Sequence, residues 1–461
     1  MTRTTMWCQW LTLAATAVSC PQAGGQPAPK QPHILVFLSD DLGWQDVGFH
    51  GSEIQTANLD RLAAAGVRLE QFYVQPVCTP TRAALMTGRY PIRYGLQVMV
   101  IRPWANYGLP LEERILAAAL KEVGYRTAIL GKWHLGHYDR AYLPTRRGFD
   151  YQYGHYNGAI DYFTHLRDGV LDWHRQDQAL REEGYSTNLI GAEAERLVAA
   201  HDPARPLLLY VAFNAPHAPL QVPQEYIDRY SQIENKQRRN YAGMVHCMDD
   251  AVGRILEAFK KRGMFEDTLV FFSSDNGGMP EKGGAGNNGP LRGTKASLYE
   301  GGIRVPALIV WPGRLKPGTM VNEPLHMVDL YPTLLKLAGA RLEQPLPLDG
   351  LDMWPTVAQG QPSPHKEILH NVDERAGAIR RGEWKLIDFR QEPGRKSGKE
   401  LYNIAQDPYE KIDLADKYPE KLQELVARLE YYAKAAVPAK GDYATTRPAG
   451  WKPPKVWGEP D

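Results

Sequence analysis

Two hydrophobic patterns alternate along the chain: short continuous apolar runs, and longer stretches with apolar residues at helical spacing. Residues 33–39 form a continuous apolar run, which is typical of a strand buried on both faces of a sheet. Residues 56–65 follow with helical spacing. Strands that alternate with helices predict an α/β domain in which a large, mostly parallel mixed sheet is sandwiched by helices.

The same alternation continues to about residue 340. Four further apolar runs predict strands at 125–130, 207–213, 268–272 and 305–310. Four stretches with helical spacing predict helices at 111–123, 189–200, 241–260 and 328–337. We therefore predict that residues 33–340 form one large domain.

The pattern changes beyond this point. Residues 376–389 resemble a hairpin that turns at Arg381-Gly382-Glu383, and residues 419–433 resemble an amphipathic helix. These elements predict a smaller C-terminal α+β subdomain over residues 341–461, with a small antiparallel sheet and a helix.

The first 32 residues have the composition of an export signal and a tether. Arg3 and the short hydrophobic stretch 11–18 predict a signal peptide over residues 1–20, and the Pro- and Gly-rich residues 21–32 predict a flexible tether. Residues 16–20 loosely resemble a bacterial lipoprotein cleavage box, which leaves lipidation of Cys20 open. Because no apolar run reaches the roughly 20 residues that span a bilayer, we expect no transmembrane segment.

Composition and charge exclude several classes of protein. With 43% hydrophobic and 23% charged residues, the 461-residue chain is neither disordered nor collagen-like. Its 54 Lys and Arg balance 53 Asp and Glu, so it lacks the basic excess usual in nucleic-acid-binding proteins. Outside the predicted signal only Cys78 and Cys247 remain, which is too few for a disulfide framework. In an exported chain, this suggests that one cysteine is kept for chemistry.

Two pairs of oxygen-bearing side chains follow buried strands: Asp40-Asp41 after the first, and Asp275-Asn276 after residues 268–272. In open α/β sheets, ligands bind beyond the carboxyl ends of the strands. Carboxylate and amide oxygens suit Ca²⁺ or Mg²⁺ rather than zinc. Each pair alone is more typical of a turn than of a metal site. The two pairs together favour a metal site.

Cys78 stands at the start of a predicted helix, with Arg82 one turn further on. The backbone N–H groups of a helix N-terminus and a guanidinium would both favour an anion there. The alternative is a structural cysteine in the core.

These residues also carry a resemblance to a known family. Cys78-Thr-Pro80-Thr-Arg82, followed by Thr87-Gly88-Arg89, resembles the signature of the type I sulfatases. Further blocks similar to that family are Gly131-Lys132-Trp133-His134, Ser274-Asp275-Asn276-Gly277, Gly293-Thr294-Lys295 and Glu300-Gly301-Gly302. Residues 41–51, 87–97 and 143–150 resemble most the arylsulfatase B branch, the N-acetylgalactosamine-4-sulfatases.

The resemblance implies an alkaline phosphatase-like fold and a set of functional residues. It implies that a maturation enzyme converts Cys78 to formylglycine, whose hydrate attacks sulfur. The residues that fall on calcium ligands are Asp40, Asp41, Asp275, Asn276 and the modified Cys78. The residues that fall on the other active-site positions are Arg82, Lys132, His134, His217 and Lys295. By the same analogy, His217 with Lys295 protonates the leaving oxygen, and His134 is the base that allows sulfate release.

The implied function is an exo-acting sulfatase on 4-sulfated N-acetylgalactosamine of glycosaminoglycans. The small number of cysteines and the predicted signal indicate a bacterial enzyme, in the periplasm or bound to the outer surface. Two alternatives remain. One is a phosphonate or phosphodiester hydrolase of the same superfamily; the other is a non-catalytic glycan-binding protein, if Cys78 is not modified.

Overall fold

The computed structural model describes residues 1–2, 4–7, 31–279 and 285–459. Most of the predicted signal and tether lies outside these residues. The chain divides into the units Met1–Lys30 and Gln31–Asp461, and every described helix and strand belongs to the second unit. Among the described residues, no helix combines the length and the apolar composition needed to cross a bilayer.

A ten-stranded sheet forms the centre of the fold, in the order β13-β2-β12-β11-β1-β10-β4-β5-β8-β9. Its middle strands run parallel, which confirms the predicted mostly parallel mixed sheet. They are β11 (Thr268–Ser274), β1 (His33–Ser39), β10 (Leu207–Ala212), β4 (Arg126–Lys132) and β5 (Tyr151–His155). The sheet is mixed because β12 (Ala307–Val310) runs antiparallel to β11.

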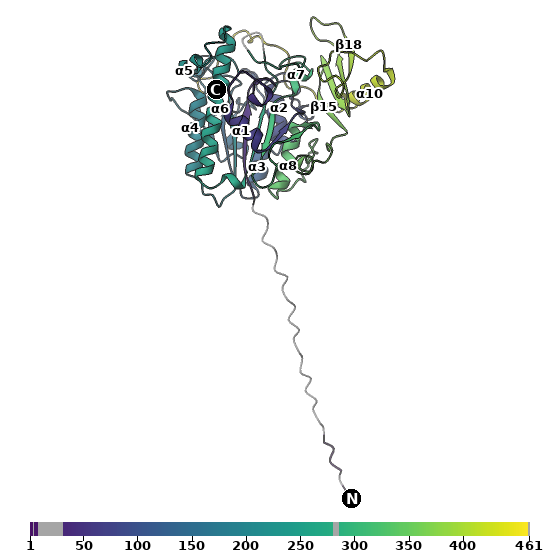
Figure 1. The fold of residues 1–461 in the computed structure, drawn as a ribbon. Helices are drawn as coiled ribbons and strands as arrows, with labels where there is room; N and C mark the ends of the chain where they lie inside the picture. The colour runs from purple at the N-terminus through teal and green to yellow at the C-terminus, as the bar shows by residue number, and fades with distance from the viewer. Residues whose placement is uncertain (3, 8–30, 280–284, 460–461) are drawn as a thin grey trace. The chain divides into compact units, whose positions relative to one another are not determined.

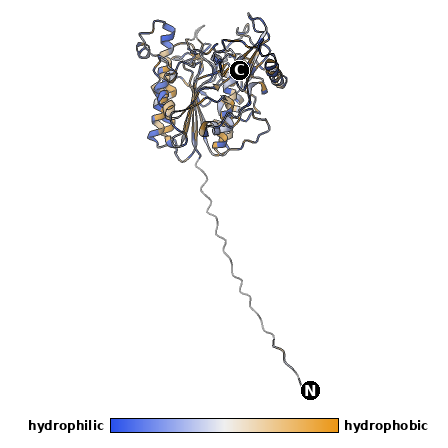
Figure 2. Cartoon of the chain, turned by 45° about the vertical axis from the view of Figure 1, so that its right-hand side comes forward, coloured by the Kyte–Doolittle hydropathy of each residue, from blue (hydrophilic) through white to orange (hydrophobic). Residues whose placement is uncertain are grey.

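Helices cover both faces of this sheet (Figure 1). One group consists of α1 (Ala57–Ala65), α4 (Ser186–Ala199), α5 (Gln224–Asp228) and α6 (Lys236–Lys261). The other consists of α2 (Cys78–Thr87), α3 (Leu116–Lys121), α8 (Leu330–Leu337) and α9 (Trp354–Gln359). Successive side chains of a strand point to opposite faces. Leu35 and Phe37 of β1 therefore pack with the first group, and Val36 with the second. Figure 2 shows the apolar residues gathered on the strands and on the helices beside them.

Short elements complete the main domain. The remaining strands are β2 (Val67–Leu69), β3 (Phe72–Tyr73), β6 (Leu166–Arg167), β7 (Val170–Leu171), β8 (His174–Arg175), β9 (Gln178–Ala179), β13 (Thr319–Val321) and β14 (Leu325–His326). The remaining helical turns are η1 (Gly48–His50), η2 (Pro91–Arg93), η3 (Arg140–Tyr142), η4 (Pro144–Arg146), η5 (Phe265–Asp267), α7 (Glu300–Ile303) and η6 (Met327–Asp329).

The C-terminal residues form a second, antiparallel sheet. Its strands are β15 (Glu367–Val372), β16 (Ala376–Arg381), β17 (Trp384–Phe389) and β18 (Gly398–Asn403). β16 and β17 confirm the predicted hairpin, and α10 (Pro419–Ala435) confirms the predicted helix. Leu425 and Leu429 of α10 pack against Ile379 and Leu386 of this sheet. The division of the chain at residue 340 stays a prediction.

Two predicted elements differ in extent. The helix predicted at 111–123 is confined to Leu116–Lys121, because the guanidinium of Arg147 binds the carbonyls of Leu109, Pro110 and Glu113 and holds that segment in a non-helical path. The strand predicted at 125–130 continues to residue 132, since Lys132 pairs with His155 of β5. Lys132 therefore lies on the strand itself and not in the loop after it.

A buried ion cluster connects the C-terminal sheet to α7. The Nζ atom of Lys385, on β17, lies 2.9 Å from Oε1 of Glu300 and 2.8 Å from Oε1 of Glu410. The Tyr73 hydroxyl donates to Oε2 of Glu300 at 2.8 Å. Lys385, Glu300 and Glu410 are fully buried. These three charged groups are therefore shielded from water and are stabilised by one another.

Candidate active site

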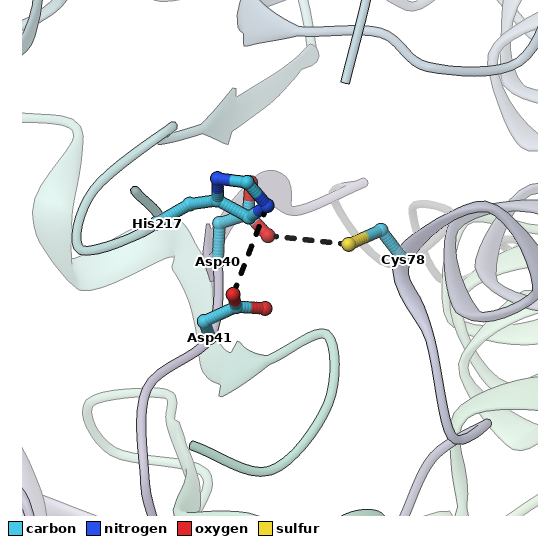
Figure 3. Close-up of side chains that lie close together, drawn as sticks. All are labelled: Asp40, Asp41, Cys78 and His217. Atoms are coloured by element: carbon cyan, nitrogen blue, oxygen red, sulfur yellow. Dashed lines mark hydrogen bonds and ion pairs between the residues drawn. The ribbon is translucent and has the colours of Figure 1, made fainter. Parts of the chain in front are cut away.

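Parallel pairing brings the predicted functional residues to one edge of the sheet. Because β11, β1, β10 and β4 are neighbours, the segments that follow them meet at their carboxyl ends. Asp40 and Asp41 follow β1, Asp275 and Asn276 follow β11, and His217 lies on the loop after β10. Figure 3 shows Asp40, Asp41 and His217 grouped opposite the thiol of Cys78.

Cys78 is the first residue of α2 and is 1% exposed. Its Sγ lies 3.3 Å from Oδ1 of Asp40, 3.4 Å from Oδ1 of Asn276 and 3.5 Å from Nζ of Lys295. Burial, reinforced by the charges of Asp275 and Asp40, raises the pKa of this thiol far above its ordinary value. An unmodified Cys78 is therefore held as a neutral thiol, which is a poor nucleophile.

Three buried carboxylates are each matched by one cation. The pKa of Asp41 is lowered although burial alone would raise it, because the charge of Lys295 and the hydrogen bonds from Asn276 and Lys295 favour the ionised form. The three ion pairs are Lys132 Nζ–Asp40 Oδ2 at 2.5 Å, Lys295 Nζ–Asp41 Oδ1 at 2.6 Å and Arg82 Nη2–Asp275 Oδ2 at 2.8 Å. The site is therefore close to charge balance before any ligand is added.

The five predicted metal ligands form one contact network. Asn276 donates from Nδ2 to Oδ1 of Asp41 at 2.7 Å, and Asp275 accepts at Oδ1 from the Asp41 N–H at 3.4 Å. Candidate ligand atoms of Asp40, Asp41, Cys78 and His217 all lie within 4.8 Å of one another. Three buried carboxylates and an amide oxygen fit a hard divalent cation.

The backbone of Asp41 explains how two adjacent carboxylates reach the same site. Neighbouring side chains of a strand normally point to opposite faces. Asp41 has a φ of 66°, in the left-handed region that non-glycine residues rarely adopt. The chain therefore turns sharply after β1, and Asp40 and Asp41 both face the thiol side of the site (Figure 3).

His134 lies beside this network but makes no hydrogen bond to Cys78 in the described part of the chain. Its Nε2 lies 3.0 Å from the Ile101 carbonyl, and its buried Nδ1 has no hydrogen-bond partner. Burial and the charge of Lys132 hold its pKa well below the usual range. Gly158 packs against the ring, where a Cβ would come within 2.4 Å of Cε1. The imidazole is therefore neutral, with one nitrogen free.

His217 is partly buried at the opening of the site. Its Nδ1 lies 2.6 Å from the Ala218 carbonyl and its Nε2 lies 3.7 Å from Oδ2 of Asp41. Burial and the charge of Lys295 lower its pKa to about 3. Because Nδ1 faces a carbonyl, that nitrogen carries the proton, and Nε2 is the atom that faces the site.

Arg82 lies among the acidic side chains of the site. Its guanidinium donates to Oδ2 of Asp275 at 3.0 and 2.8 Å and to the Lys132 carbonyl at 3.2 Å. No hydrogen bond from Arg82 to Cys78 occurs among the described residues. Arg82 therefore fixes a carboxylate and the end of β4.

Sequence analysis missed two side chains that position the site. The Thr79 hydroxyl donates to the His134 carbonyl at 3.1 Å and accepts from the Ile101 N–H at 3.1 Å. The Tyr241 hydroxyl donates to the Asp41 carbonyl at 3.1 Å. Thr79 follows Cys78 directly, and this adjacency was the only available signal. Tyr241 lies on α6 and had no signal.

Two family models match the chain. The model described as Sulfatase matches residues 32–340. The model described as N-sulphoglucosamine sulphohydrolase, C-terminal, matches residues 294–435.

Individual proteins are similar over nearly the whole chain. Arylsulfatase J of Mus musculus is 40% identical, over 93% of this chain and 80% of its own length. N-acetylgalactosamine-6-sulfatase of Homo sapiens is 32% identical, over 94% of this chain and 91% of its own length. Among solved structures, Ps i-CgsB in complex with k-i-k-neocarrahexaose superimposes with a TM-score of 0.83 and 36% identity, covering 90% of this chain and 95% of that one.

Proposed function

This chain belongs to the sulfatase family and hydrolyses sulfate esters, and from that premise we propose that it uses a formylglycine made from Cys78 to cleave the sulfate of a sulfated carbohydrate. One observation carries the proposal. Cys78 stands at a buried helix N-terminus, within 3.5 Å of Asp40, Asn276 and Lys295. As a thiol it would be inert there, because burial keeps it protonated.

The modification supplies the missing reactivity. The hydrated aldehyde carries two hydroxyl groups on one carbon, of which one can attack sulfur and the other can then expel sulfate. A formylglycine-generating maturation enzyme is therefore a required partner. Thr79 and Pro80, which follow Cys78, belong to the segment that such an enzyme would recognise.

The donor set fits calcium. Calcium held by Asp40, Asp41, Asp275 and Asn276 beside residue 78 would supply positive charge for the sulfonate oxygens and acidify a neighbouring hydroxyl. His217 Nε2 and the unmodified Cys78 sulfur, which lie in the same cluster as Asp40 and Asp41, are ligands that zinc would prefer.

The side chains of this protein have distinct roles in the proposed reaction. Lys132 and Lys295 bind the sulfonate oxygens and neutralise charge that develops on them. His217, beside Lys295, protonates the leaving oxygen, and the negative sulfonate favours the protonated imidazole that this step needs. His134 accepts a proton at its free Nδ1. Arg82 positions Asp275 through two hydrogen bonds.

We propose 4-sulfated N-acetylgalactosamine of glycosaminoglycans, cleaved in an exo manner, as the substrate. A panel of mono- and disaccharides sulfated at defined positions is expected to show sulfate release fastest from the 4-sulfated galactosamine, with a kcat/KM at least about tenfold above that of the 6-sulfated isomer. Released sulfate is measured directly. Faster release from the 6-sulfated isomer would contradict the proposed 4-sulfate position on the sugar. Faster hydrolysis of a phosphodiester would contradict the assignment of the site to sulfate esters.

Removal of the metal gives a second test. Dialysis against a chelator is expected to abolish sulfate release and to lower the thermal unfolding temperature, because a cation that binds only the folded chain stabilises it. Calcium should restore both quantities. Restoration by zinc and not by calcium would contradict the calcium assignment, and full activity after verified metal removal would contradict any metal role.

We also propose that the chain is exported, to the periplasm or outer surface of a bacterium, on the basis of residues 1–32. Mass spectrometry of the mature N-terminus tests this, and a lipidated Cys20 would identify a surface anchor.

A further inference from the structure

Arg102 lies beside the proposed active site but has no role in the chemistry described above. The residue before it, Ile101, donates its N–H to Thr79 Oγ1 at 3.1 Å. The Ile101 carbonyl lies 3.0 Å from Nε2 of His134. Arg102 therefore directly follows a residue that contacts both His134 and Thr79, the neighbour of Cys78.

Arg167 approaches the same histidine from another segment. Its Nη1 donates to the Ala159 carbonyl at 3.3 Å. Ala159 follows Gly158, the residue whose lack of a side chain makes room for the His134 ring. Arg102, on a loop, and Arg167, on β6, therefore both lie next to segments that contact His134.

The charges of these arginines are only partly compensated. Arg102 is partly buried, its Nε is buried without a hydrogen-bond partner, and its guanidinium forms no ion pair within the described ranges. Arg167 pairs with Asp168 at 3.1 Å, and Arg447 shares that carboxylate. Burial and the like charge of Arg167 both lower the pKa of Arg102, while Tyr107, the exposed Asp442 and Cys78 oppose this. A partly buried guanidinium beside a second one is stabilised by an anion that contacts both.

We propose that Arg102 and Arg167 form a second anion subsite, which binds a carboxylate or a further sulfate of the glycan beside the sulfate that is cleaved. This inference rests on the proposed function, and it narrows the substrate to saccharides with at least two negative groups. The planar guanidinium suits both groups, because its parallel N–H bonds match two oxygens of a carboxylate or a sulfate.

Binding to an inactive chain tests the subsite without turnover. The full-length Cys78→Ala protein with calcium is titrated calorimetrically with a disaccharide of 4-sulfated N-acetylgalactosamine and glucuronic acid. It is also titrated with the matched disaccharide in which glucose replaces glucuronic acid. A second pair compares 4,6-disulfated with 4-sulfated N-acetylgalactosamine. In one of the two pairs, the more highly charged saccharide is expected to bind at least about tenfold more tightly than its partner, because it gains one charge-assisted contact. The pair that responds identifies the carboxylate or the sulfate.

Variants assign the effect to the two arginines. The quantity compared is the dissociation constant of the less charged saccharide divided by that of the more highly charged one. Arg102→Gln and, separately, Arg167→Gln are expected to reduce this ratio to no more than about two. Arg314→Gln, an exposed arginine on the loop after β12, is the matched control and should keep the ratio. Equal affinity for both members of both pairs, or a ratio that neither variant changes, overturns the subsite. Sulfate release by the unaltered chain from the 4-sulfated disaccharide that carries glucuronic acid separately decides the proposed function.

Discussion

The Cys78→Ala variant is expected to release sulfate at least about 10⁴-fold more slowly than the unaltered chain, when both are produced with the maturation enzyme. The physical reason is that alanine offers no group to attack sulfur and no second hydroxyl to expel the product. The variant should still fold, because only a thiol is lost and its neighbours keep their own ion pairs. Sulfate release and the thermal unfolding temperature are measured together.

Cys247 provides a matched control. It is the other free cysteine of the described chain, it is also buried, and its thiol contacts Asn188 on α4. Cys247→Ala is expected to cost about 1 kcal/mol of stability and to leave turnover within about twofold. Full activity in Cys78→Ala would refute the proposed nucleophile. An unconverted thiol at position 78 in the native host would point instead to the glycan-binding alternative.

The Lys385→Met variant is expected to lose about 3–5 kcal/mol of folding free energy, because it removes the cation beside the buried carboxylate of Glu410 and leaves Glu300 only the more distant Arg304, at 3.7 Å. That loss is a large share of the 5–15 kcal/mol that typically stabilises a folded chain. The α7 segment, which contains Glu300 and Gly302, should also become less ordered. The Gly302 carbonyl accepts from the Gly277 N–H at 2.9 Å, so the change is expected to reach the residue next to Asn276. Denaturant unfolding measures the loss. Lys336→Met, which removes an exposed pair with Asp352, should cost no more than about 1 kcal/mol.

The loss of folding free energy in Lys385→Met should depend on pH. Burial raises the pKa of Glu410 from 4.5 to about 7, and Lys385 opposes that rise. A carboxyl with a higher pKa in the folded chain binds more protons when folded, so its contribution to stability decreases as the pH rises from 4.5 to 7. Without Lys385 the pKa of Glu410 rises further, and the loss of stability is expected to be smaller at pH 5 than at pH 8. An equal loss at both values would mean that the cluster is not the cause.

The central strands of the sheet could be predicted from the sequence because they are buried on both faces. Such strands are continuous apolar runs, and β1 and β10 were found to within one residue. Short edge strands such as β6 and β9 are only two residues long, and two residues have no detectable pattern. The helix at 111–123 was predicted too long because the competing partner of its carbonyls, Arg147, lies elsewhere in the sequence.

The order of blocks around Cys78, Asp275 and Lys295 identified the family, and the family models confirm it. The roles of the individual site residues stay predictions, although the structure brings most of them into one network.

The linear sequence was enough to determine the class of fold, the cysteine at a helix start and the oxygen-rich strand ends, since each depends on neighbours along the chain. Only the folded chain decided which charges face each other. It paired Arg82 with Asp275 and left Nδ1 of His134 and Nε of Arg102 buried without a hydrogen-bond partner. Such pairings depend on Coulomb forces and burial between segments that are distant in the chain, and no local pattern records them.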